Sequence, residues 1–280
     1  MDLSLPTGSE SLPVHLRRLK AVCRNAMGEP TVLGMVIGGS FASGEADVYS
    51  DLDMQLVVED EAVEATSGEL RRLAEEAGPV VAAFFAEHVG LPHMLIVLYD
   101  DLIHADFEPL AVTQVGTRNA GLATHVLWER DGIVSSALTG TQEEDPAADL
   151  RWIEDRMWTW SWYIQTKVLR GELYEALDGL QYLRDSVLFK LLAIRRGERP
   201  SGARRVEARI GEWAHQFADT LPVLSRESMM RALRASMTLY QMLADPLLER
   251  YGVEAGRAAR TVVLDALEAG FDWTPPEPSS

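Results

Sequence analysis

The sequence has little cysteine, few basic residues and no long apolar run. One cysteine among 280 residues excludes an internal disulfide, and the helical pattern around Cys23 predicts a buried thiol. No apolar run approaches the roughly 18 residues of a membrane-spanning helix, and "MDLSLPTGSE" lacks the basic and apolar segments of a secretory signal. We therefore expect a cytoplasmic protein with no membrane partner.

Basic residues are scarcest in the first half of the chain. Residues 1–140 hold 8 Lys and Arg against 21 Asp and Glu, and residues 141–280 hold 18 against 22, giving a net charge of −17. Such a balance repels a polyanion, so we expect no nucleic-acid polymer as a partner. It suits a divalent metal or a cationic small molecule. Zinc-ligand spacing, a Walker-type loop and a nucleophilic triad are also missing from the sequence.

Apolar periodicity changes character near residue 141. Before that point, the patterns predict helices over 11–27 and 59–78, strands over 31–39, 51–58 and 79–88, a short final strand with a turn over 125–132, and a hairpin over 93–110 that turns at Asp100-Asp101. The second of these helices is expected to be interrupted near Ser67-Gly68. After it, helices are predicted over 147–170, 173–196, 203–219, 225–249 and 255–269. We therefore predict an α+β fold, with a mixed β-sheet and flanking helices in residues 1–140 and an α-helical bundle in residues 141–280.

Acidic residues follow the strand period on two segments. Asp51 and Asp53 leave the same face of one strand, and His104, Asp106 and Glu108 share a face of another. Two carboxylates that point together repel each other unless a cation lies between them, and Mg²⁺ is the natural choice for hard oxygen ligands. If the two strands are neighbours, Asp106 completes a cluster of three carboxylates suited to phosphoryl or nucleotidyl transfer.

A glycine turn precedes the first acidic pair. Gly38 and Gly39 allow a ligand to approach the backbone closely, and Ser40 adds a hydroxyl at the start of a short helix. Free N–H groups at such a start bind anions. The turn therefore predicts a site for the phosphates of a nucleotide.

The spacing of these motifs resembles that of the DNA-polymerase-β-type nucleotidyltransferase superfamily. The chain length and helical second half resemble the aminoglycoside and lincosamide nucleotidyltransferases of antibiotic resistance. This resemblance implies that Gly39 and Ser40 bind phosphate and that the aspartates 51 and 53 bind Mg²⁺. It also implies that Asp106 is the third carboxylate, which takes the proton from the acceptor hydroxyl. Glu108 and Glu87 are alternative bases.

The cations that a triphosphate needs must then come from the second half, because Lys20 is the single lysine of the first. Lys167 and Arg170 lie three apart on one helical face, and Arg184 follows on the next helix. We expect these residues to assist nucleotide binding, with a solvated helix face as the alternative. His104 is a weak candidate neighbour of the metal or substrate. The tryptophan-rich segment 152–163 is expected to form core or an interface, which leaves a homodimer open.

Two functions are consistent with these patterns. The first is Mg²⁺-dependent transfer of a nucleoside monophosphate, AMP from ATP or its equivalent from another nucleoside triphosphate, to a hydroxyl of a small molecule such as an aminoglycoside or lincosamide. The second is a protein-adenylylating or toxin–antitoxin-type nucleotidyltransferase, or a catalytically silent nucleotide-binding module.

Overall fold

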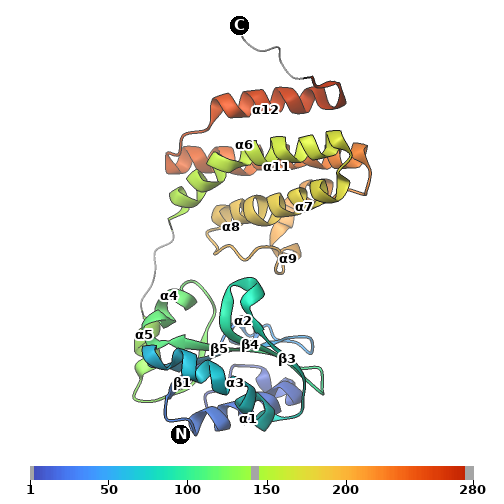
Figure 1. Ribbon diagram of the computed structural model, residues 1–280. Coiled ribbons are helices and arrows are strands. Elements are labelled where there is room, and N and C mark those ends of the chain that lie inside the picture. Colours follow the sequence, from blue (N-terminus) through green and yellow to red (C-terminus); the bar gives the residue numbers. More distant parts are fainter. Residues whose placement is uncertain (1–2, 140–144, 275–280) are drawn as a thin grey trace. The chain divides into compact units, whose positions relative to one another are not determined.

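The computed structural model describes residues 3–139 and 145–274. They fall into two compact units, Met1–Glu143 and Glu144–Ser280, which we call the sheet unit and the helical unit (Figure 1). In the described part of the chain, no helix is long and apolar enough to cross a bilayer. Cys23 is fully buried, as predicted, and burial raises the pKa of its thiol to about 12.

The described residues of the sheet unit contain one six-stranded sheet with the order β3-β4-β5-β2-β1-β6. Its strands are β1 (Val32–Ile37), β2 (Leu52–Val58), β3 (Val80–Ala86), β4 (Leu91–Tyr99), β5 (His104–Ala111) and β6 (His125–Glu129). Strands β2 and β5 run parallel, whereas the other neighbouring pairs are antiparallel. The sheet is therefore mixed, as predicted, and the β4–β5 hairpin turns at the expected aspartates.

Helices α1 and α3 cover one face of this sheet (Figure 1). The helices of the unit are α1 (Pro13–Met27), α2 (Gly39–Ser43), α3 (Val63–Ala77), α4 (Val115–Asn119) and α5 (Ile133–Leu138). Leu19 of α1 and Leu70 of α3 are fully buried in a core that also contains Phe107 of β5. The predicted interruption of α3 is wrong, because one mid-helix glycine costs only about 1 kcal/mol and the Ser67 hydroxyl donates to the carbonyl of His93 (3.2 Å).

The helical unit contains the long helices that the sequence predicts. They are α6 (Pro146–Arg170), α7 (Leu173–Leu183), α8 (Phe189–Arg196), α9 (Glu207–Ile210), α10 (Ala214–Asp219), α11 (Arg226–Tyr251) and α12 (Arg257–Ala269). A π-helical turn, Arg184–Leu188, joins α7 to α8. The single helix predicted over 203–219 is wrong, because Gly211 adopts a left-handed φ of 48° and separates α9 from a 3₁₀ turn and α10.

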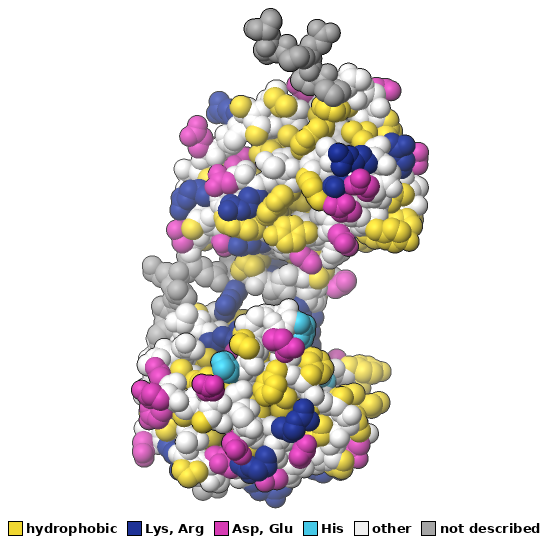
Figure 2. All heavy atoms as spheres, in the orientation of Figure 1, with side chains coloured by type: hydrophobic (Ala, Val, Ile, Leu, Met, Phe, Trp, Pro, Cys, Tyr) yellow, Lys and Arg dark blue, Asp and Glu magenta, His cyan; other side chains and the backbone are white. Residues whose placement is uncertain are grey.

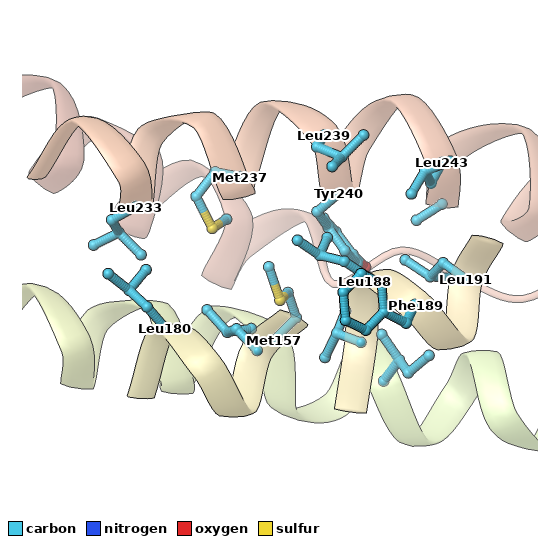
Figure 3. Close-up of a cluster of buried hydrophobic side chains, with 14 of the residues drawn as sticks. Met157, Leu180, Leu188, Phe189, Leu191, Leu233, Met237, Leu239, Tyr240 and Leu243 are labelled. Carbon is cyan, nitrogen blue, oxygen red and sulfur yellow. The ribbon is translucent and has the colours of Figure 1, made fainter. Parts of the chain in front are cut away.

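The core of the helical unit lies where α6, α7, α8 and α11 meet. Figure 3 shows Met157, Leu180, Leu188 and Met237 among the apolar side chains that interdigitate there. The tryptophan segment of α6 belongs largely to this packing: Trp158 is 2% exposed and meets the Tyr240 ring edge-on at a centroid distance of 5.5 Å. Core packing therefore accounts for part of the aromatic density.

Candidate functional site

The register of β2 and β5 brings the predicted carboxylates together. Asp53 pairs directly with Asp106, and the preceding pair is Leu52 with Ala105. Asp51 comes immediately before β2, two residues from Asp53, so its side chain leaves the same face. The structure thus confirms that the two acidic strands are neighbours, on which the three-carboxylate hypothesis depended.

Asp106 is a partly buried acid in a negative environment. The pKa of its carboxyl is raised to about 6: burial is the largest cause, Asp53, Asp51 and Glu108 also raise the pKa, and His104 lowers it. Its Oδ1 atom is buried and makes no hydrogen bond, and its one contact with a ring nitrogen, His104 Nε2, is long at 3.4 Å. The carboxyl therefore has an acceptor atom with only a weak partner in the protein.

A polar network lies next to Asp53 and Asp106 on the same face of the sheet; we call the acids on this face, Asp53, Asp106 and Glu108, the acidic row. Gln55 pairs with Glu108 in the strand register and donates to it (3.2 Å), while Asn119 of α4 donates to Gln55 (2.8 Å). Arg118 of α4 donates through Nε to Glu108 Oε1 (2.8 Å). The sequence analysis missed this arginine. A signal was present, since it is the one Lys or Arg between residues 73 and 129.

The glycine turn lies beside Asp53. The Gly38 amide donates to the Asp53 carbonyl (2.8 Å), and Gly39 has a φ of 59°, which only glycine adopts readily. Ser40 is buried at the start of α2, where its hydroxyl donates to the hydroxyl of Ser50 (2.9 Å). The turn therefore begins at the end of β1, the strand next to β2, which carries Asp53.

The residues of the row suit a magnesium ion only in part. Among residues 3–139 and 145–274, no three His, Cys, Asp or Glu side chains are gathered closely enough to hold a metal by themselves. The expected convergence of three carboxylates is therefore not met by the side chains as they stand. Mg²⁺ commonly takes one or two carboxylates and completes its shell with water and substrate phosphates. Asp53 and Asp106, with the unsatisfied Oδ1 atom, fit that smaller requirement.

The three predicted cations belong to the helical unit. Lys167 Nζ lies 2.9 Å from Glu172 and 3.0 Å from Glu175, and Arg170 is mostly exposed at 3.7 Å from Glu172. Arg184 is 5% exposed and donates to the Thr220 carbonyl (2.8 Å). Its burial lowers the pKa of the guanidinium. Arg184 therefore belongs to the interior of the helical unit. Lys167 and Arg170 form ion pairs with glutamates at its surface.

The alternative bases differ in position. Glu108 lies on β5, two residues after Asp106, but it is engaged by Arg118 and Gln55. Glu87 is exposed in the 3₁₀ turn that follows β3, and β4 separates that strand from β5. Since neighbouring strands lie about 4.8 Å apart, Glu87 is on the order of 10 Å from the β5 row. Asp106 is thus the candidate base closest to Asp53.

Figure 2 shows acidic, basic and apolar side chains interspersed over the visible face of each unit, without a continuous basic stripe there. A basic stripe is the usual electrostatic footprint of a nucleic-acid-binding surface.

Comparison with known proteins gives a distant likeness. No family model matches the sequence, and no curated protein does so significantly. The structure is similar to an aminoglycoside 6-adenyltransferase from Bacillus subtilis (14% identity, TM-score 0.40, 91% of this chain and 98% of that one). It is also similar to a nucleotidyltransferase-like protein from Exiguobacterium sibiricum (11%, 0.38, 81% and 74%) and to a CD-NTase from Bradyrhizobium diazoefficiens in complex with GTP (16%, 0.31, 95% and 95%). These values carry no inference about activity, which rests on the residues of the chain itself.

Proposed function

We propose that this protein transfers a nucleoside monophosphate, AMP from ATP, to a hydroxyl group of a small molecule in a Mg²⁺-dependent reaction. The observation that carries the proposal is the direct pairing of Asp53 with Asp106 on adjacent parallel strands. The Gly38 amide, bonded to the Asp53 carbonyl, ties the glycine turn to this pair. Two facing acids beside a glycine turn are the groups that a donor site for a metal–nucleotide complex needs.

Each residue has a distinct task in this proposal. Asp53 and Asp106 would hold Mg²⁺, with Asp51 next to them at the start of β2, and the ion when bound would supply charge neutralisation at the phosphates. The turn over residues 38–40 would orient the triphosphate through backbone N–H groups. Asp106 would also accept the proton of the attacking hydroxyl, because it is the candidate base closest to Asp53 in the strand register.

Cations contribute to nucleotide binding in two ways. Lys167 and Arg170 remain proposed phosphate contacts from the helical unit, on the strength of their spacing on α6. Arg118 belongs to the sheet unit itself, and its hydrogen bond to Glu108 places a positive charge beside the acidic row. Arg184 is left out, since its guanidinium is committed to the carbonyl of Thr220.

Calorimetry with ATP in the presence and absence of Mg²⁺ tests the donor site. We expect saturable binding that requires the metal, and its loss in the double variant Asp51→Ala/Asp53→Ala. Glu59→Ala is the matched control, because this exposed carboxylate lies just beyond the opposite end of β2. Equal binding of Mg²⁺–ATP by the wild type and the double variant would contradict the proposal.

Incubation with labelled ATP then identifies the acceptor class. Label that appears on a small molecule, together with release of pyrophosphate, is the expected result. Label on a polypeptide would instead favour the protein-adenylylating alternative. Metal-dependent binding without any label transfer would favour the catalytically silent module.

A further inference from the structure

The strand register extends the row of the paired aspartates across the whole sheet. Ile96 of β4 pairs with Asp106, and Phe84 of β3 pairs with Ile96. Directly paired residues of neighbouring strands share a face of the sheet. One row therefore runs from Gly38 through Asp53 and Asp106 to Ile96 and Phe84.

The β4–β3 end of this face is apolar. In the neighbouring row, Leu98 of β4 pairs with both His104 of β5 and Ala82 of β3. Phe84 is 51% exposed, although phenylalanine is usually buried, and Ile96 and Leu98 are partly exposed. This end of the face therefore presents hydrocarbon to its surroundings, directly beside the acidic end.

At the β1 side of the sheet, the same face is covered by a helix. Val134 of α5 packs with Val36 of β1 and Val57 of β2 in a separate small core. Figure 1 shows β1 and α5 on one side of the sheet, and β4 and β3 on the other. The acidic row thus has a packed apolar core on one side and partly exposed apolar side chains on the other.

The proposed reaction determines what approaches from the β4–β3 side. In an in-line transfer, the attacking oxygen and the leaving pyrophosphate lie on opposite sides of the reacting phosphorus. If the triphosphate lies on the β1 side, at the turn over residues 38–40, then the acceptor hydroxyl must enter from the β4 side of Asp106. The part of the acceptor next to its hydroxyl then lies over Ile96 and Phe84.

We propose that the β4–β3 face, formed by Phe84, Ile96 and Leu98, is the acceptor-binding surface, and that it selects a hydroxyl compound with an apolar group next to the reacting hydroxyl. This inference rests on the proposed nucleotidyl transfer. It adds to that function a choice between two classes of acceptor that the sequence left open: a polycation such as an aminoglycoside, and a compound with an apolar substituent such as a lincosamide. A polycation that is polar on every side gains nothing from these side chains, whereas an alkyl- or aryl-substituted sugar buries its apolar group on them.

The test measures acceptor binding without requiring turnover. Protein loaded with Mg²⁺ and a non-hydrolysable ATP analogue is titrated by calorimetry with phenyl and methyl glycosides of the same sugar. Lincomycin, which carries an alkyl chain, and kanamycin, a polycation, form a second pair of probes. We expect the apolar member of each pair to bind at least tenfold more tightly than its polar partner.

Variants assign the difference to the face. Phe84→Ser should weaken binding of the phenyl glycoside at least fivefold, whereas Phe84→Leu should retain most of it. Val81→Ser is the matched control, since this exposed apolar residue of the same strand lies at an irregularity in the β3–β4 pairing. Binding of Mg²⁺ and ATP should stay within twofold of the wild type in all three variants, which also shows that they fold.

The outcomes separate this inference from the function on which it rests. If the wild type does not bind Mg²⁺–ATP, both the proposed function and the acceptor surface are overturned. Retained nucleotide binding with no preference for the apolar probes, or with no effect of Phe84→Ser, would overturn the acceptor surface alone. A change of molecular mass in Phe84→Ser, with unchanged probe binding, would also overturn it and assign the face to contact with a second copy of the chain.

Discussion

The helical unit contains a buried carboxylate and the sheet unit a partly buried one, and the surroundings of the two differ. Glu154 of α6 is 6% exposed and accepts hydrogen bonds from Trp158 Nε1 (2.7 Å), the Gly256 amide (2.9 Å) and the hydroxyl of Tyr240. The Oδ1 atom of Asp106 on β5 makes no hydrogen bond and has only a long contact, 3.4 Å, with His104 Nε2; the pKa of this carboxyl is raised to about 6, chiefly by burial. Glu154 is surrounded by hydrogen-bond donors, whereas Asp106 is surrounded mainly by other carboxylates.

This difference separates a structural acid from a candidate functional one. Removing a carboxylate from water is costly unless hydrogen bonds replace its hydration. The donors around Glu154 join α6 to α11 and to the start of α12, so its bonds stabilise the helical unit. The acidic surroundings of Asp106 favour a ligand, because a bound cation would offset the repulsion from Asp53 and Asp51.

Replacing Asp106 should give the largest effect on activity without any loss of stability. Asp106→Asn preserves the shape of the side chain but removes its charge and its ability to accept a proton. We expect kcat for pyrophosphate release to fall by roughly 10²–10⁴-fold, the range for loss of a general base. The midpoint of thermal unfolding should stay the same or rise, since the repulsion from the neighbouring aspartates is relieved. A fall in that midpoint with unchanged kcat would show that Asp106 is structural, like Glu154.

Glu154→Ala should show the opposite behaviour. It leaves the Trp158 N–H and the Tyr240 hydroxyl buried without their acceptor, at an expected cost of about 3 kcal/mol in the free energy of unfolding. Urea denaturation followed by far-ultraviolet circular dichroism, which is dominated by helix, measures the loss. Asp155→Ala on the exposed side of α6 is the control and should change the free energy by less than about 0.5 kcal/mol. Similar values for both variants would contradict the structural role of Glu154.

Asp101 tests the comparison within the sheet unit. Its Oδ2 atom accepts from Arg18 Nε (3.0 Å) and Arg17 Nη2 (3.2 Å), while its Oδ1 atom, like that of Asp106, is buried without a hydrogen bond. Burial alone would raise the pKa of this carboxyl, but hydrogen bonds to the two arginines and the charge of Arg18 outweigh it and hold the pKa below its usual range. Asp101 should therefore behave as a structural group, although it lies close to Asp106 in sequence, just before β5.

A depressed native pKa fixes the sign of the pH dependence. The unfolded Asp101 titrates near about 3.9, so its stabilisation is present above that pH and is lost as the pH falls through the lower native pKa. Asp101→Asn should cost about 2 kcal/mol at pH 7, and this difference should shrink below about pH 4. Urea unfolding from pH 7 to pH 3 measures it, with the exposed Glu75→Gln as the control. A difference that grows on acidification would contradict the assignment.

The sequence predicts local geometry well and distant pairing poorly. Alternation of apolar and acidic residues sufficed to place Asp51, Asp53 and Asp106 on common strand faces, because the period of a strand is a local property. The parallel pairing of β2 with β5 depends on contacts between distant segments, so it remained a condition of the hypothesis. Gly211 ended a helix through a left-handed φ that the surrounding periodicity does not reveal.

Side-chain partners were the least predictable feature. Arg184 was a reasonable phosphate-binding candidate by charge, yet its guanidinium reaches the Thr220 carbonyl inside the helical unit. Arg118 was overlooked because its helix, α4, is short and lies outside the glycine–aspartate motif. Its importance follows only from the fold, which brings it to Glu108. The charge pattern of the sequence therefore indicates that basic side chains are needed to bind phosphate, but it does not indicate which lysines or arginines bind it.

Arg118→Gln should have the smallest effect and would sharpen the comparison of the two units. The variant removes a positive charge beside the acidic row but keeps a hydrogen-bond donor for Glu108. We expect the KM for Mg²⁺–ATP to rise roughly threefold with little change in kcat, as befits a partly exposed ion pair. Arg17→Gln, another exposed arginine of the sheet unit, is the control and should leave KM unchanged. If Lys167→Gln raises KM and Arg118→Gln does not, the nucleotide draws its cations from the helical unit; the reverse result would mean that the sheet unit supplies its own.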